Sequence, residues 1–102
     1  MGHAGREAAP QIVVQVVWTR RAAADVLAIR AYIGQFNPLA AQRMALRLRT
    51  AGDALATHPE RGRAIGGGRR ELLSVPPYLI RYKVSAGAVE ILTIRHGARR
   101  PE

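Results

Sequence analysis

The sequence contains no cysteine, which excludes disulfide bonds and thiolate metal ligands and is typical of a reducing compartment. It also has no apolar run close to the roughly 20 residues that a membrane-spanning helix needs. The first ten residues lack the apolar stretch of a signal peptide. These absences indicate a cytoplasmic protein that does not enter a membrane.

Aromatic residues are scarce, with one tryptophan, three tyrosines and one phenylalanine in 102 residues. Aliphatic side chains must therefore fill the core, and an apolar content of 48% is enough for one thin core of that kind. The length suits one small domain, which we expect to span residues 12–102. Residues 1–11 are expected to form a flexible N-terminal extension.

Residues that bind metals or cofactors are also few. The three histidines are widely spaced and, without cysteine, do not make up a metal-ligand set. The glycine triplet at 66–68 lacks the lysine and the following helix of a phosphate-binding loop. We therefore expect neither a metal nor a cofactor.

Acidic residues are outnumbered by basic ones, seven to sixteen, so the chain carries a formal charge of +9. Every basic residue except Lys83 is arginine, whose planar fork of donors suits phosphate and carboxylate groups. A high-GC genome would favour arginine over lysine, but it does not explain the shortage of aspartate and glutamate. The charge thus predicts a polyanionic target, an acidic protein partner, or both.

The C-terminal third has the alternating pattern of a β-meander. We predict three antiparallel strands, at 71–75, 78–85 and 89–95. Pro76 and Pro77 separate the first two strands because proline lacks an amide N–H and has a fixed φ. Gly87 permits the second turn, since glycine adopts a positive φ easily.

Upstream of the meander, the pattern predicts one strand, two helices and a loop, at 11–18, 20–35, 38–57 and 60–68 respectively. Thr19 and Asn37 are suitable N-caps, and Pro38 suits the first position of the second helix. The short connection makes the helices an antiparallel hairpin. We therefore expect an α+β fold of order β-α-α-β-β-β, a small antiparallel sheet with the helical hairpin on one face.

Each helix carries an apolar stripe that should face the sheet or the other helix. The stripe of the first helix comprises Ala22, Val26, Ile29, Ile33 and Phe36, widened by Leu27 and Tyr32. The stripe of the second comprises Ala41, Met44, Leu48, Ala51 and Leu55.

A series of short motifs runs in order from Val14 to Arg99: Val17–Thr19, Ala24–Leu27 with Ile29, Tyr32–Ile33, Asn37–Pro38 with Ala40–Ala41, His58–Pro59 with Gly62–Arg63, Arg70–Leu72, Pro77–Ile80 with Tyr82, Ile91–Leu92 and His96–Arg99. Their order and spacing resemble those of the RelE/ParE toxin superfamily of type II toxin–antitoxin (plasmid stabilisation) modules. The resemblance implies the fold predicted above. It also implies a hetero-oligomer with an acidic antitoxin that wraps the toxin with a helix and sometimes an added strand.

The resemblance implies two possible activities. ParE-like members inhibit DNA gyrase without catalytic residues, and the asparagine–proline hairpin and proline–tyrosine strand resemble that branch more. RelE-like members cut mRNA on the ribosome, which requires a base, an acid and arginines that stabilise the phosphorane. His96 as acid or base and Arg81 as phosphate stabiliser are the candidates for that alternative. A single lysine weakens it, since ribosome-dependent members tend to rely on several.

Both candidates also have structural interpretations, because a lone histidine at a strand end is often structural and Arg81 can simply be a solvated sheet residue. A third alternative is a non-toxic relative that only binds an antitoxin. The residues that we expect to bind nucleic acid or the target are arginines of the loop and the C-terminal end: Arg61, Arg63, Arg69, Arg70, Arg95 and Arg99.

Overall fold

The computed structural model of the chain describes residues 13–97, so the predicted extension at 1–11 and the predicted target-binding residue Arg99 lie outside the described residues. The elements are β1 (Gln15–Trp18), α1 (Arg20–Gly34), α2 (Pro38–Asp53), a 3₁₀ turn η2 (Ala54–Ala56), β2 (Arg63–Gly66), β3 (Arg69–Val75), β4 (Tyr78–Ser85) and β5 (Ala88–His96). Neither α-helix in this part of the chain is both long and apolar enough to cross a membrane.

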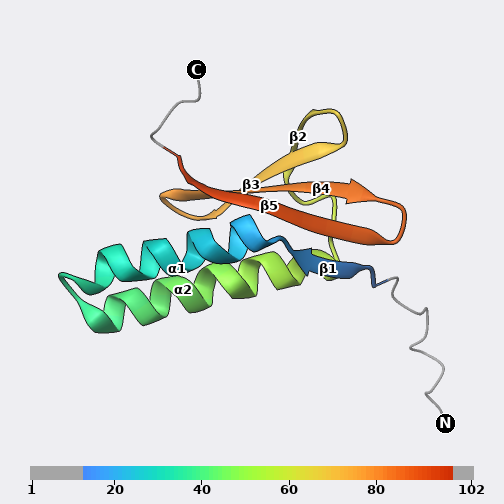
Figure 1. The fold of residues 1–102 in the computed structure, drawn as a ribbon. Helices are drawn as coiled ribbons and strands as arrows, with labels where there is room; N and C mark the ends of the chain where they lie inside the picture. The colour runs from blue at the N-terminus through green and yellow to red at the C-terminus, as the bar shows by residue number, and fades with distance from the viewer. Residues whose placement is uncertain (1–12, 98–102) are drawn as a thin grey trace, which may run out of the picture.

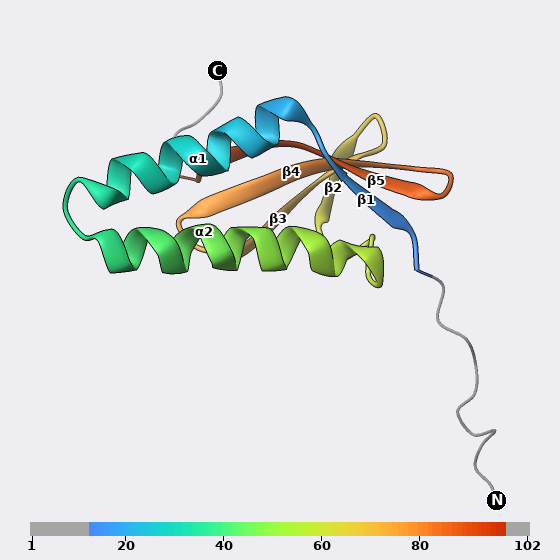
Figure 2. The same ribbon diagram turned by 60° about the horizontal axis from the view of Figure 1, so that its bottom comes forward.

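The molecule has two layers, a five-stranded sheet and a helical hairpin that covers one face of it (Figure 1). The strand order is β1-β5-β4-β3-β2, and α1 and α2 run side by side beneath the central strands (Figure 2). The α+β class, the helical hairpin and the β3-β4-β5 meander are as predicted. The face of the sheet opposite the helices is called the open face below.

The sheet differs from the prediction in being mixed rather than antiparallel. β1 pairs with β5 in parallel, with Gln15 opposite Ala88 and Trp18 opposite Ile91. A parallel pair needs a long crossover connection, which the two helices and three strands supply here. The direction of this pairing could not be read from the sequence, because the partners are more than 70 residues apart along the chain.

The predicted loop at 60–68 was wrong in its second half. Residues 63–66 form β2, which pairs antiparallel with β3, and the turn between them uses glycines with φ values of 98°, 65° and 77°. The glycine triplet is therefore a hairpin turn, for which positive φ is required. β2 has mostly exposed side chains and thus no alternating apolar pattern to reveal it.

The helices begin where the capping residues predicted. The Thr19 hydroxyl accepts a hydrogen bond from the Ala22 amide at 3.1 Å, and the Asn37 side chain accepts one from the Ala40 amide at 3.0 Å. Each cap satisfies one of the four amides that a helix N-terminus leaves unpaired. The second helix ends as η2 rather than continuing to Thr57, and β1 is shorter than the predicted strand at 11–18.

The core lies between the two layers and is largely aliphatic, as expected. Its buried members are Ala22, Leu48, Leu55, Leu72, Val75, Ile80, Tyr82, Val89, Ile91 and Ile94. The predicted stripe of α1 was too wide, because Leu27, Tyr32 and Phe36 are exposed. A helix lying on a sheet buries only one stripe, so the outer apolar residues remain in solvent.

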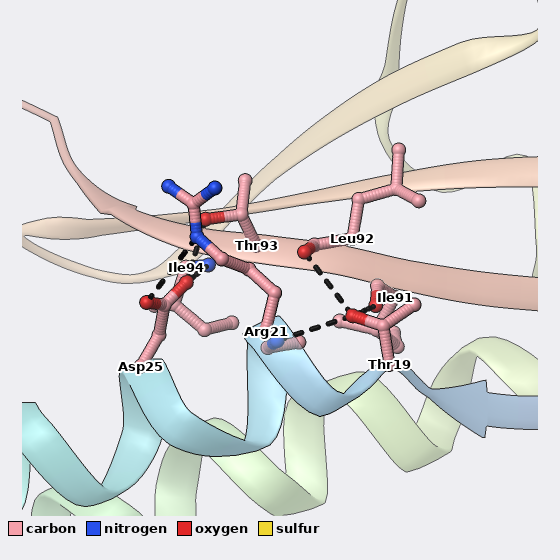
Figure 3. Close-up of polar contacts among 8 residues, drawn as sticks. Thr19, Arg21, Asp25, Ile91, Leu92, Thr93 and Ile94 are labelled. Carbon is pink, nitrogen blue, oxygen red and sulfur yellow. Dashed lines mark hydrogen bonds and ion pairs between the residues drawn. The ribbon is translucent and has the colours of Figure 1, made fainter.

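Two polar side chains fasten the start of α1 to the free edge of β5 (Figure 3). The Thr19 hydroxyl donates to the Ile91 carbonyl oxygen at 2.7 Å. The Asp25 carboxylate accepts from the Thr93 hydroxyl at 2.6 Å and from the Ile94 amide at 3.0 Å. Because β1 ends opposite Ile91, this carboxylate pairs with the Ile94 amide on an edge of β5 that no longer has a neighbouring strand.

The end of β1 is fixed against the end of α2 by Trp18. Its indole nitrogen donates to an Asp53 carboxylate oxygen at 2.9 Å, and the Arg49 guanidinium lies 5.3 Å from the ring centroid. The ring packs on Gly52, where an added Cβ would lie only 2.4 Å from an indole carbon. Glycine at position 52 therefore makes room for the indole.

Candidate target-binding and partner-binding surfaces

A row of charged side chains crosses the open face, where strand register places Arg63, Glu71 and Arg81 in line. The Arg81 guanidinium donates to one Glu71 carboxylate oxygen at 2.5 and 3.1 Å, and Arg63 donates to the other at 3.1 Å. Glu71 is the centre of this row, and its side chain is only 9% exposed. The hydrogen bond from Arg81 is the largest cause that holds the pKa of Glu71 below its usual value, and burial opposes it.

Glu71→Gln is expected to flatten the acid limb of the stability curve. Because the pKa of Glu71 is lower in the folded than in the unfolded chain, its ionised carboxylate stabilises the fold at pH values above the unfolded pKa of a glutamate, about 4.3. This stabilisation is lost as the pH falls through the lower pKa of the folded state. Denaturant unfolding at several pH values from 7 to 2 measures this. Wild type should lose stability below about pH 4 more steeply than the variant, whereas two parallel curves would contradict this role of Glu71.

The rest of the open face is predominantly basic. Register places Arg69 opposite Lys83, and Lys83 opposite Glu90. Arg95 lies further along β5, opposite Leu79. Because Ile80, Tyr82 and Ile94 point into the core, their neighbours Arg81, Lys83 and Arg95 point the other way. The open face thus carries five basic residues and two acidic ones: Arg63, Arg69, Arg81, Lys83 and Arg95 against Glu71 and Glu90.

The structure does not place Arg81 and His96, the two candidates for RNA cleavage, in one site. His96 lies opposite Tyr78, and their rings meet edge to face at 5.5 Å. That histidine lines a hollow with α1 residues such as Ile29, on the face of the sheet that the helices cover. Arg81 lies on the open face and is paired with Glu71. The two side chains therefore have no common substrate position.

The two remaining predicted arginines, Arg61 and Arg70, lie in and beside the loop before β2. The Arg70 guanidinium donates to the carbonyl oxygens of Gly62 at 2.7 Å and Glu60 at 3.3 Å, so it holds the loop. The Tyr82 hydroxyl reaches the same loop and donates to the Pro59 carbonyl oxygen at 2.8 Å.

Tyr82 also accepts a hydrogen bond from the Gly62 amide at 2.8 Å, and burial is the main cause that raises the pKa of its phenol. Arg61 is exposed and makes no ion pair within residues 13–97, so it differs from Arg70 in being available to a partner.

An exposed apolar surface lies on the helices, on the side away from the sheet, and was missed from the sequence. Leu27 of α1 and Leu46 of α2 are 62% and 67% exposed. They line a groove of about 530 Å³ between the helices, which is called the hairpin groove below. Its other lining residues are Trp18, Ala23, Val26, Ala45 and Arg49. A second hollow, lined by Leu27, Arg30 and Gln42 among others, extends it toward the helix connection.

The excess apolar width of α1 was the signal that could have revealed this groove. Leu27 and Tyr32 lie outside the stripe that one sheet can bury, and leucines exposed on this scale on a small protein mark an interaction surface. The amphipathic pattern alone predicts that they face the sheet or the other helix.

The fold and these surfaces show that the chain is a small, strongly basic α+β protein with a basic sheet face and an apolar helical face. Comparison with known proteins identifies its family. Residues 16–101 match the family described as "ParE toxin of type II toxin-antitoxin system, parDE". The chain therefore belongs to the ParE toxin family of type II toxin–antitoxin systems.

Individual relatives agree with this assignment. Toxin RelE2 of Caulobacter vibrioides is 66% identical over 87 residues, which cover 85% of this chain and 99% of that protein. The putative toxin Y4kP of Sinorhizobium fredii is 43% identical over 84 residues, 80% of this chain and 86% of that protein. A solved structure described as "Chromosomal ParDE TA system from P. aeruginosa" aligns with a TM-score of 0.73 at 25% identity, over 82% of this chain and 96% of that one.

Proposed function

We propose that this toxin acts in the cytoplasm by binding and blocking DNA gyrase through the open face of its sheet. The observation that carries the proposal is the separation of Arg81 and His96 onto opposite faces, with Arg81 paired to Glu71. A nuclease needs its proton-transfer group and its phosphate-stabilising group at one phosphate. An inhibitor that binds a protein needs only a complementary surface, and the open face offers excess positive charge for one.

The proposal is tested by giving one preparation of antitoxin-free protein to two assays. Purified gyrase with relaxed plasmid should lose supercoiling activity, and translating ribosomes should keep their transcript intact. Transcript cleavage that disappears in His96→Ala, with the fold preserved, would support the RelE-like alternative instead. A chain that binds its antitoxin but leaves gyrase, transcript and cell growth unaffected would be the non-toxic relative.

We also propose that the hairpin groove receives an amphipathic helix of the antitoxin. Membership of the family implies an antitoxin partner. The groove offers Leu27 and Leu46 to the apolar face of a helix, and the exposed Arg30 lies along its extension for an acidic residue. The net charge of +9 favours an acidic partner over a second copy of the chain.

A further inference from the structure

The open face changes in character toward the turn that joins β3 to β4. Leu79 of β4 lies opposite Arg95 of β5, and residues 73–74 of β3 lie on its other side. Leu73 points to the open face, because its neighbour Leu72 is buried in the core. Leu73 and Leu79 are therefore neighbours on adjacent strands, and Arg95 is next to them.

A third leucine adds to this surface from β5. Figure 3 shows the Leu92 side chain on the side of β5 away from α1. It lies at the register shift between β4 and β5, next to the pair formed by Arg81 and Thr93. Leu73 is 59% exposed, and Leu79 and Leu92 are half-buried. These three leucines are called the leucine patch below.

The charges beside the leucine patch are mostly paired with one another. Arg81 donates to the Glu71 carboxylate, and the two side chains are only 21% and 9% exposed. A partner that covers this end of the open face therefore meets apolar surface and an ion pair that is already formed. Arg95, at the border, makes no ion pair within residues 13–97 and stays available. An apolar centre with a charged rim is the usual composition of a protein–protein interface.

Nucleic acid is a poorer match to the same surface. Stacking on single-stranded bases needs aromatic rings, and those of residues 13–97 lie in the core, against it or on α1: Trp18, Tyr32, Phe36, Tyr78 and Tyr82. The carboxylates of Glu71 and Glu90 on the open face would repel phosphates. Leucine side chains offer a phosphate no hydrogen bond.

We propose that the leucine patch anchors the open face to gyrase by entering an apolar pocket of that enzyme's protein surface, with a carboxylate at the rim of the pocket for Arg95. This inference rests on the proposed function and names the surface recognised, which is protein rather than the DNA that gyrase holds. Leu73 contributes most, because it has the largest apolar area left to bury. A second copy of this chain does not fit, since two chains of net charge +9 repel each other.

The first test compares Leu73→Thr with Leu39→Thr in a supercoiling titration of purified gyrase. Threonine removes apolar surface but suits a strand, and position 73 is exposed, so the fold should be retained, which thermal unfolding verifies. Leu39 is the matched control, because it is 55% exposed and lies on α2 in the other layer. Leu73→Thr should need about tenfold more protein for half-maximal block, and the control less than about threefold more.

The second test measures binding of the toxin to gyrase without DNA. Wild type should bind the DNA-free enzyme, and Leu73→Thr should bind it about tenfold more weakly. Equal potency of wild type and Leu73→Thr would overturn the leucine patch as the anchor. Binding that occurs only when DNA is present would overturn it too, since nucleic acid would then supply the recognised surface. In both cases wild type still blocks supercoiling and the proposed function stands, whereas no block by wild type would contradict the proposed function itself.

Discussion

Leu27→Asp is expected to weaken binding of the antitoxin by roughly 100-fold while leaving the toxin folded. Leu27 is 62% exposed in the free protein, so a polar side chain there costs little in the monomer. In the complex the same position would lie against the apolar face of the antitoxin helix. An aspartate at that contact would lose water without gaining a partner.

Leu39→Asp is the control for this variant. Leu39 is also a largely exposed leucine, 55%, on the same helical hairpin, but it lines neither hollow of the outer helical surface. Its position in the first turn of α2 tolerates a carboxylate, which is favoured near a helix N-terminus. Dissociation constants from titration calorimetry separate the two variants. Equal losses of antitoxin affinity in Leu27→Asp and Leu39→Asp would contradict the proposal that the antitoxin helix binds in the hairpin groove.

Gly52→Ala is expected to destabilise the fold by about 3 kcal/mol, a large fraction of the stability of a small domain. The new Cβ would lie 2.4 Å from one indole carbon of Trp18 and 2.9 Å from another. The ring cannot easily turn away, because Asp53 holds its nitrogen and Arg49 lies against its face. Either β1 or α2 must therefore move, and both elements contribute side chains to the core or pack against it.

Gly34→Ala provides the matched comparison at the end of α1. A Cβ at that position would meet the Cβ of Ala41 at 3.7 Å, an ordinary contact. Alanine also suits a helix better than glycine, so the variant should be neutral or slightly stabilised. Thermal unfolding should show the melting temperature of Gly52→Ala reduced by roughly 10–20 °C and that of Gly34→Ala unchanged or raised. Similar melting temperatures of the two variants would show that Trp18 leaves room for a Cβ at position 52, which would contradict the prediction.

The sequence was sufficient to predict those parts of the fold that depend on local rules. Thr19 and Asn37 are caps because short polar side chains satisfy helix amides. Gly87 lies in the turn between β4 and β5 because glycine easily adopts the positive φ, here 78°, that this turn requires. The pairing of β1 with β5 and the hairpin containing β2 were not predictable in the same way. They depend on contacts between distant residues and on strands of four residues without a clear alternating pattern.

In the candidate site, too, the features set by local sequence patterns were predictable, and those set by contacts between distant residues were not. Positive charge predicted an acidic partner, and the alternation of β4 placed Arg81 on the outward face. The ion pairs of Glu71 with Arg63 and Arg81 require the register of three strands, which no local pattern contains. The exposure of Leu27 depends on how much of α1 the sheet can cover, and the amphipathic pattern alone overestimated it.

We propose above all that the toxin engages its target through the open face of the sheet. A supercoiling titration of purified gyrase tests this most directly. Wild type and the control Arg43→Glu, whose charge lies on the helical layer, should block supercoiling at similar concentrations. The double variant Lys83→Glu/Arg95→Glu, which reverses two charges of the open face, should need at least about tenfold more protein. Equal potency of all three proteins, or no block by wild type at concentrations that arrest growth, would contradict the account.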